Sequence, residues 1–309
     1  MVRILRRRGG RKYDRIVAFF TVMVSVYFPA VSHADSDVLQ WNAPAIRASC
    51  PEGRNAVWAE YPGGQACMRF FVGGNVEGAD TVVIRLNGDH TSYVERDPST
   101  IPDNTVEAQN RIAQGMSDSL RLPVVVIARP GMYGSSGDHL RRRSEEEFRA
   151  INAALDQIKL LYGFKRVVLS GQSGGATAGA ALMTFGRTDV VCAVLTSGPF
   201  ALLERAELIR RRDGFRSNPE FDVTGVKWPY DPLDHIDGMA TDPNRNIVVI
   251  GNPGDKTAQF VFQARYVDAL KAHGHNARLL EWPAQPPNNH VLQEPLGVVY
   301  LRQCGNLEV

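Results

Sequence analysis

Residues 166–181 read RVVLSGQSGGATAGAA, and this stretch decides the fold class. The run Arg166–Ser170 is β-branched and apolar, which predicts a buried strand, and the Ala/Gly-rich residues that follow predict a thin helix. Between them stands Gly171-x-Ser173-x-Gly175. A tight strand–turn–helix elbow needs glycines at both flanking positions, because side chains there would strike the neighbouring strand and helix. The stretch therefore predicts a strand, a sharp turn centred on Ser173 and a helix, with a Gly-rich turn that carries no chemistry as the alternative.

A serine in such an elbow has the surroundings that a nucleophile needs. A serine hydroxyl is a poor nucleophile unless it meets a base and the substrate at the same time, and the strained turn presents it to both. The helix that begins behind Ser173 also points the backbone N–H of Gly174 at negative charge that develops there. Ser173 is therefore the first candidate catalytic residue.

Short β-branched runs alternate with amphipathic helical patterns on both sides of the elbow. This alternation predicts an α/β protein whose mostly parallel central sheet is covered by helices on both faces. The expected strands are Met68–Val72, Asp80–Leu86, Pro123–Ala128, Arg166–Ser170, Val190–Leu195, Arg245–Ile250 and Ala277–Glu281. The expected helices include one that Asn104 caps and that runs to about Leu120, one behind the capping box Ser144–Glu147, and Thr257–His273. Residues 200–243 break this rhythm with a basic helix (Leu202–Arg212) and a Pro-rich loop, so we expect a small lid-like insertion over the strand ends.

The motif, order and spacing of these elements resemble the α/β-hydrolase superfamily from about Asp80 to Leu301. Within it, the layout looks closest to single-domain relatives of prolyl-oligopeptidase and acyl-peptidase enzymes and to dienelactone-hydrolase-like esterases. The resemblance implies a serine hydrolase whose orienting acid follows a late strand and whose histidine follows the last strand, in the chain order Ser, Asp, His.

Asp255 and His290 match these two positions. The strand-like run Asn246–Ile250 leads into Gly-Asn-Pro-Gly-Asp-Lys-Thr, which places Asp255 where the acid is implied, and an N-cap of the following helix is a compatible alternative role. His290 follows Ala277–Glu281 through a Pro/Asn-rich loop, and it alone among the six histidines of residues 35–309 has this position. In this interpretation His290 takes the proton of Ser173, while Asp255 holds the imidazole in the right tautomer.

The resemblance also implies a second oxyanion donor in the loop after the strand that ends at Leu86. Asn87-Gly88-Asp89-His90 occupies that place, and it departs from the His-Gly-Gly form of many esterases. We expect the backbone N–H of Gly88 or Asp89 to join that of Gly174 in an oxyanion hole.

Two residues in loops at expected strand ends are candidates for the substrate pocket. Tyr133 lies in the loop 129–137, which resembles a segment near the active site of the family, and His90 lies in the oxyanion loop. A Gly-rich turn that simply packs is the alternative for the first loop.

Residues 1–34 predict a secretory signal peptide. Seven basic residues and one acid precede or flank an apolar run of about sixteen residues, and Ser32-His33-Ala34 offers small residues for cleavage after Ala34. A membrane span needs roughly twenty apolar residues, so a cleaved signal is favoured over an uncleaved anchor. Residues 35–309 would then form one α/β-hydrolase domain that is exported, either to the periplasm or into the medium.

The targeting segment also explains the charge of the chain. The whole sequence has a net charge of +2, but residues 1–34 contribute +6, so the remainder is acidic at about −4. This remainder has no basic patch that would favour nucleic acid and no second apolar run that could cross a membrane. We therefore expect neither nucleic-acid binding nor stable membrane association after signal cleavage.

Four cysteines remain after cleavage of the signal. Cys50 and Cys67 flank a Pro/Gly-rich stretch and could close a small loop, whereas Cys192 could be a buried thiol or a partner of Cys304. None of them has the spacing of a zinc site, so the sequence implies no metal and no organic cofactor.

Three functions are compatible with these residues. The first is an esterase that acts on small acyl or carbohydrate esters outside the cytoplasm. The second is a peptidase, but prolyl-oligopeptidase-like peptidases usually carry a β-propeller for which this chain is too short, so the expected substrate is a small-molecule ester before a peptide. The third is a non-catalytic binding protein on the same fold, which an intact Ser173, Asp255 and His290 argues against.

Overall fold

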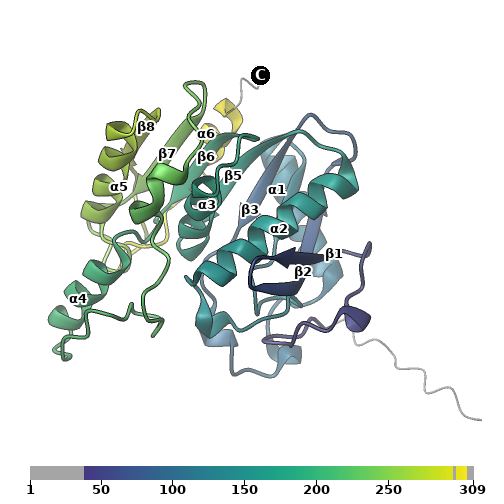
Figure 1. The fold of residues 1–309 in the computed structure, drawn as a ribbon, viewed down its shortest axis with the longest axis horizontal. Coiled ribbons are helices and arrows are strands. Elements are labelled where there is room, and N and C mark those ends of the chain that lie inside the picture. Colours follow the sequence, from purple (N-terminus) through teal and green to yellow (C-terminus); the bar gives the residue numbers. More distant parts are fainter. Residues whose placement is uncertain (1–37, 295–296, 305–309) are drawn as a thin grey trace, which may run out of the picture. The chain divides into compact units, whose positions relative to one another are not determined.

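A computed structural model describes residues 38–294 and 297–304 of the chain (Figure 1). The expected signal peptide, residues 1–34, lies outside the described residues. Within the two described segments, no helix is long and apolar enough to cross a membrane.

The centre of the fold is an eight-stranded sheet with the strand order β1-β2-β4-β3-β5-β6-β7-β8. Strand β2 runs antiparallel to both β1 and β4, and every other neighbouring pair is parallel. The strands are β1 (Ala56–Tyr61), β2 (Gly64–Gly73), β3 (Thr81–Leu86), β4 (Val124–Ile127), β5 (Arg166–Gln172), β6 (Val190–Thr196), β7 (Asn246–Gly251) and β8 (Ala277–Glu281). Because β3 to β8 are parallel, the loops after their carboxyl ends meet at one edge of the sheet, where ligands bind in open α/β sheets.

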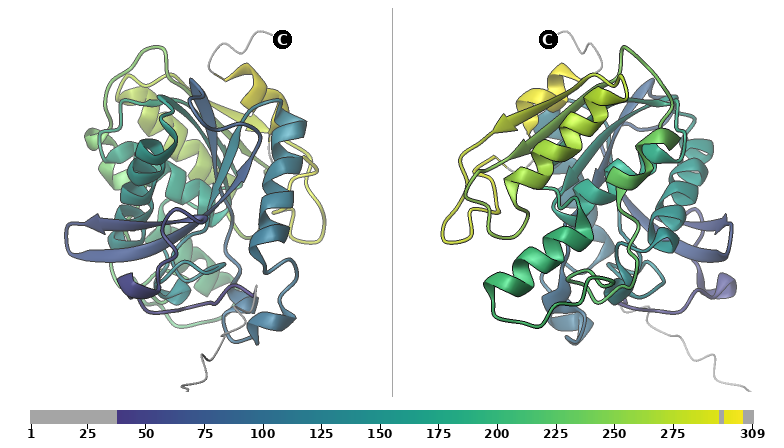
Figure 2. Two further views of the ribbon diagram at one scale, coloured as in Figure 1. Left: turned by 90° about the vertical axis from the view of Figure 1, so that its right-hand side faces the viewer. Right: turned by 60° about the vertical axis from the view of Figure 1, so that its left-hand side comes forward.

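Helices cover both faces of this sheet. The left view of Figure 2 shows α1 (Val106–Leu120) on one side and α2 (Glu145–Tyr162) and α3 (Gly174–Thr184) on the other. A hydrophobic core lies on each face of the sheet, and successive residues of one strand point into opposite cores. In β3, Val82 and Ile84 belong to the core on the α2 side, whereas Val83 belongs to the core on the α1 side. Helix α5 (Phe260–Ala272) adds to the α2 side, and α6 (Val298–Gln303) adds to the α1 side. The α/β architecture with two covered faces is therefore confirmed.

Two helices begin one to three residues later than the sequence pattern predicted. Thr105, not Asn104, caps α1, because its hydroxyl accepts from the N–H of Ala108 at 3.1 Å. Asn104 is buried instead and accepts from the indole of Trp41 at 3.0 Å, which anchors the N-terminal segment. Helix α5 begins at Phe260 and not at Thr257.

Residues 200–243 depart from the alternating pattern as expected. Helix α4 (Leu202–Arg212) is followed by loops and by the 3-10 helix η5 (Pro232–Gly238). The carboxylate of Asp231 accepts from the N–H groups of both Leu202 (2.5 Å) and Leu233 (3.1 Å), so it ties the two ends of this segment together. Burial raises the pKa of Asp231 to about 6.

Two disulfides close the fold, and the described residues hold no free cysteine. Cys50–Cys67 joins the N-terminal segment to β2, and Cys192–Cys304 joins β6 to the end of α6. The structure thus selects the bridge over the free thiol for Cys192.

Candidate active site

Ser173 stands at the turn between β5 and α3 with a backbone conformation that non-glycine residues rarely adopt (φ 52°, ψ −125°). Its N–H donates to the carbonyl of Thr196 on the neighbouring strand at 2.8 Å, which holds the turn. A side chain at Gly171 would place Cβ 2.6 Å from Cα of Ala176, and one at Gly175 would collide with the carbonyl oxygen of Leu86. The glycines thus let the strand, the turn and the helix approach closely enough to form the strained elbow.

Three residues from different loops form a hydrogen-bond relay at this turn. Nε2 of His290 lies 2.9 Å from Oγ of Ser173, and Nδ1 of His290 lies 2.9 Å from Oδ2 of Asp255. A carboxylate only accepts hydrogen bonds, so the ring proton sits on Nδ1 and Nε2 accepts from the serine hydroxyl. The relay therefore has the polarity that proton removal from Ser173 requires.

Backbone hydrogen bonds hold the side chain of Asp255 in place independently of His290. Its side chain is fully buried, and Oδ1 accepts from the N–H groups of Thr257 (2.7 Å) and Ala258 (2.9 Å). These bonds leave Oδ2 for His290. Asp255 does not cap α5, because that helix begins at Phe260 with Gln259 at its N-cap. The two oxygens of Asp255 instead hold the turn at Thr257–Ala258 and the histidine.

The loop that carries His290 is held on two sides. The hydroxyl of Ser197, at the end of β6, donates to the carbonyl of His290 at 2.8 Å. The N–H of Lys256 donates to the carbonyl of Asn288 at 2.9 Å, which joins this loop to the loop of Asp255. The side chain of His290 is 15 % exposed and Ser173 is partly exposed, so solvent reaches the serine end of the relay.

The loop after β3 lies against the elbow, as expected for an oxyanion loop. A Cβ at Gly88 would lie 3.2 Å from Cβ of Ser173, and a Cβ at Gly174 would collide with Oδ1 of Asp89. Within the described part of the chain, the N–H groups of Gly88, Asp89 and Gly174 donate to no other group. The residues that carry the three candidate donors therefore lie close to Ser173, and their N–H groups are not engaged elsewhere in the described segments.

Asp89 belongs to a buried charge cluster that sequence reasoning did not find. Its Oδ1 accepts from Nη1 of Arg129 (2.7 Å), and its Oδ2 accepts from Nε of Arg142 (3.1 Å) and Nη2 of Arg143 (2.9 Å). Burial alone would raise the pKa of Asp89, but Arg143, Arg129 and Arg142 together hold it well below its ordinary value. Arg129 also pairs with Glu147 at 2.7 Å, so the cluster ties the oxyanion loop to the start of α2. Two sequence features could have indicated this cluster: the loop Arg129-Pro130-Gly131, which contains Arg129, and the capping box Ser144–Glu147, which contains Glu147.

The two candidate pocket residues lie together in an aromatic cluster. The ring of His90 stacks on Tyr93 with centroids 5.4 Å apart, and Tyr133 packs edge-on against Trp41 at 5.0 Å. Burial lowers the pKa of His90 and raises that of Tyr133 to about 12, so both rings are neutral at neutral pH. Tyr133 is buried, which favours the packing role that the sequence left open, whereas His90 keeps part of its surface exposed.

Arg205 of α4 is a further buried polar residue beside the relay that the sequence pattern did not single out. It shares the buried side of α4 with Leu202 and Ala206, and it is only 3 % exposed. An arginine on the apolar side of an amphipathic helix was the signal that could have found it.

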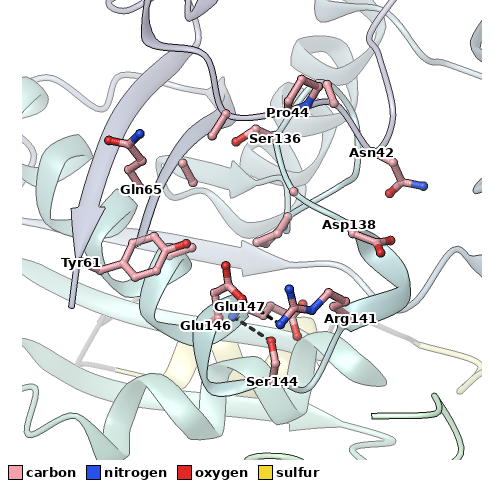
Figure 3. Close-up of a pocket in the computed structure, with 16 residues that line it drawn as sticks. Asn42, Pro44, Tyr61, Gln65, Ser136, Asp138, Arg141, Ser144, Glu146 and Glu147 are labelled. Atoms are coloured by element: carbon pink, nitrogen blue, oxygen red, sulfur yellow. Dashed lines mark hydrogen bonds and ion pairs between the residues drawn. The ribbon is translucent and has the colours of Figure 1, made fainter. Parts of the chain in front are cut away.

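A separate hollow of about 400 Å³ lies away from the relay, between the β1–β2 hairpin and the start of α2. Figure 3 shows Tyr61, Gln65 and Arg141 around it, and Ser173, Asp255 and His290 do not line it. Among the described residues, no group of three or more His, Cys, Asp or Glu side chains has a metal-binding arrangement.

Comparison of the sequence with protein-family models and with curated proteins finds no match. Solved structures do match. The esterase Pf2001 of Pyrococcus furiosus superposes with a TM-score of 0.54 at 15% identity, over 82% of this chain and 92% of that one. Est1E of Butyrivibrio proteoclasticus gives a TM-score of 0.51 at 13% identity, over 80% of this chain and 96% of that one.

An acylaminoacyl peptidase of Pyrococcus horikoshii gives a TM-score of 0.51 at 12% identity, over 79% of this chain. This chain spans only 39% of the peptidase's length. Together with the strand order and the two covered faces, these likenesses confirm that the chain has the α/β-hydrolase fold. The fold hosts many chemistries, so function is argued from the site.

Proposed function

We propose that this chain is an exported serine hydrolase that cleaves a carboxylic ester through an acyl-enzyme. Ser173 is the nucleophile, His290 the general base and Asp255 the orienting acid. The observation that carries this proposal is the unbroken relay of two 2.9 Å hydrogen bonds that ends on a serine in a strained elbow.

In the first half-reaction, Oγ of Ser173 attacks the carbonyl carbon of the ester while Nε2 of His290 takes the hydroxyl proton. Asp255 stabilises the imidazolium that results, without itself becoming protonated. The C–O bond to the leaving alcohol then breaks, His290 returns its proton to the alkoxide oxygen, and an acyl-serine remains.

In the second half-reaction, water adds to the acyl carbon while His290 takes one of its protons. The carboxylic acid leaves when the proton returns to Oγ of Ser173. In both steps the negative charge on the carbonyl oxygen is stabilised by the N–H of Gly174 and by that of Gly88 or Asp89, which donate to no other group within the described residues.

An amide can be cleaved by the same relay, so a serine peptidase is the second candidate function. The acylaminoacyl peptidase with this fold supports it. The esterases Pf2001 and Est1E align over 92% and 96% of their own lengths, which supports the ester. A non-catalytic binding protein is the third candidate, and it has no need of the relay.

A fluorophosphonate probe separates catalysis from binding. It should label the parent protein covalently and fail to label Ser173→Ala, and an unlabelled parent would favour the binding protein. Rates on p-nitrophenyl butyrate and on aminoacyl anilides then separate esterase from peptidase. Asp255→Asn should lower kcat on the preferred substrate about 10⁴-fold, because the imidazole loses the acceptor that sets its tautomer.

We also propose that residues 1–34 are a signal peptide, that residues 35–309 form the exported domain, and that segment 200–243 covers the substrate. Two disulfides support export, because such bonds persist in oxidising compartments. Fractionation of an expressing cell and N-terminal sequencing of the product test the first point. A product that begins at Asp35 outside the cytoplasm is expected, and an uncleaved cytoplasmic chain would refute export.

A further inference from the structure

Arg205 reaches from α4 to the loop that carries the orienting acid. Its Nε donates to the carbonyl of Thr257 at 2.8 Å, two residues after Asp255. The side chain is only 3 % exposed, so this single hydrogen bond holds a buried guanidinium at the edge of the candidate active site.

The other edge of this guanidinium has no partner among the described residues. Nη1 of Arg205 is buried and donates to no acceptor. Nη2 also makes no hydrogen bond, but it is not fully buried, so solvent reaches this edge. A buried cationic nitrogen without an acceptor is costly and calls for an explanation, and a bound anionic ligand would supply the missing acceptor.

The neighbouring arginines have carboxylate partners, although Nη2 of Arg129 and Nε of Arg143 are also buried without a hydrogen bond. Arg129, Arg142 and Arg143 each bond to the carboxylate of Asp89. Arg205 forms no such ion pair within residues 38–294 and 297–304, where a backbone carbonyl is its sole acceptor. Among these four arginines, Arg205 is therefore the one without a carboxylate partner in the part of the chain that the structure describes.

Four charged side chains lie near enough to Arg205 to act on its guanidinium. They are Arg143 and the carboxylates of Asp222, Asp89 and Asp255. Asp89 lies beside Gly174, and Asp255 bonds to His290, so the hydrogen bond of Arg205 to Thr257 places its side chain next to the candidate active site. Burial and Arg143 lower the pKa of Arg205 to about 9, so the side chain is charged at neutral pH.

We propose that Arg205 binds a carboxylate of the substrate, and that the preferred substrates are esters carrying such a carboxylate within reach of the scissile bond. This inference rests on the proposed esterase function. A guanidinium presents two parallel N–H groups on its Nη1–Nη2 edge, and a carboxylate accepts both at once. Binding would supply the acceptor that Nη1 lacks and would orient the ester carbonyl toward Ser173.

Two esters with the same acyl chain test the inference. They are 4-nitrophenyl hydrogen adipate, which carries a free carboxylate, and 4-nitrophenyl methyl adipate, in which that carboxylate is capped. The readout is the ratio of kcat/KM for the anionic ester to that for the neutral one. Arg205→Met should lower this ratio about 30-fold, as loss of a charge-assisted hydrogen bond predicts. Arg205→Lys keeps the positive charge but lacks the two parallel N–H groups of a guanidinium. Its ratio should therefore lie between that of the parent and that of Arg205→Met.

Arg211→Met is the matched control, because Arg211 lies on the same helix and is exposed. Its ratio should equal that of the parent. An unchanged ratio in Arg205→Met overturns the inference while leaving the esterase function intact. Absence of turnover of both esters by the parent, together with no fluorophosphonate labelling, removes the esterase function itself and the inference with it.

A measurement on the parent protein guards against variants that fold poorly. Adipate should inhibit hydrolysis of the neutral ester competitively, at a concentration at least about tenfold lower than adipamide needs. Equal inhibition by the two compounds would overturn the inference without any substitution.

Discussion

Replacing Asp89 by asparagine tests how the buried arginine cluster supports the oxyanion loop. One oxygen of Asp89 accepts from Arg129, and the other accepts from Arg142 and Arg143. Asparagine has one acceptor oxygen and one NH₂ donor, so either orientation turns a donor toward at least one arginine N–H. Arg129 and Arg143 each keep a second carboxylate, whereas Arg142 keeps none within the described residues.

The expected loss follows from the burial of the partners. Removing one member of a buried ion pair costs about 3–5 kcal/mol, because the remaining charge is left without a counter-charge. The side chains of Asp89 and Arg142 are 16% and 11% exposed, so solvent screens part of the charge and the lower end applies. Asp89→Asn should therefore lower the free energy of unfolding by about 3 kcal/mol, or roughly 150-fold in the folding equilibrium constant.

Urea denaturation followed by tryptophan fluorescence measures this loss. Asp80→Asn is the control. Asp80 directly precedes β3, the strand that the loop of Asp89 follows, and it forms an exposed ion pair with Arg166. Exposed pairs contribute little to stability, so the control should change the free energy of unfolding far less. A loss in Asp89→Asn no larger than that of the control would refute the reasoning.

The loss should also depend on pH in a defined direction. The arginines hold the pKa of Asp89 below its ordinary value of 3.8, so its contribution to stability is complete above that pH. The contribution disappears as the pH falls further, because the unfolded chain then takes up a proton on this carboxyl before the folded protein does. The difference in unfolding free energy between the parent and Asp89→Asn should therefore be full at neutral pH and shrink below pH 3.8.

Three further predictions use other parts of the fold. Thr105→Ala removes the side-chain cap of α1 and should lower the free energy of unfolding by about 1 kcal/mol in urea; no loss would contradict the cap. The double change Cys192→Ala with Cys304→Ala opens a link across 112 residues and should cost about 4 kcal/mol in the same assay, which a melting temperature equal to the parent's would contradict. Gly88→Ala places a methyl group 2.5 Å from Oε1 of Gln172 and 3.2 Å from Cβ of Ser173 and should lower kcat on p-nitrophenyl butyrate about tenfold or more; an unchanged kcat would contradict a close fit of this loop to the reacting ester.

Local chemistry explains which elements could be predicted. Strands β3 to β7 lie inside the sheet with both faces buried, so they are nearly continuous apolar runs that a sequence reveals. Strand β1 was not predicted, because two alanines and a glutamate among its six residues give it a weak strand pattern. The cap of α1 was assigned to Asn104, because Asn104 and Thr105 are both good N-cap residues. The structure has Thr105 as the cap, since the side chain of Asn104 accepts from the indole of Trp41 instead.

The sequence by itself determined the elbow around Ser173, because strand, glycine turn and helix are adjacent in the chain and their sterics are local. It also indicated Asp255 and His290 through their order relative to the strands. Only the tertiary structure decided the relay, since His290 stands 117 residues from Ser173 and 35 from Asp255. It likewise decided that Arg205 has an unpaired edge. That property depends on which carboxylates other loops bring to the carboxyl edge of the sheet, and no local pattern records those distances.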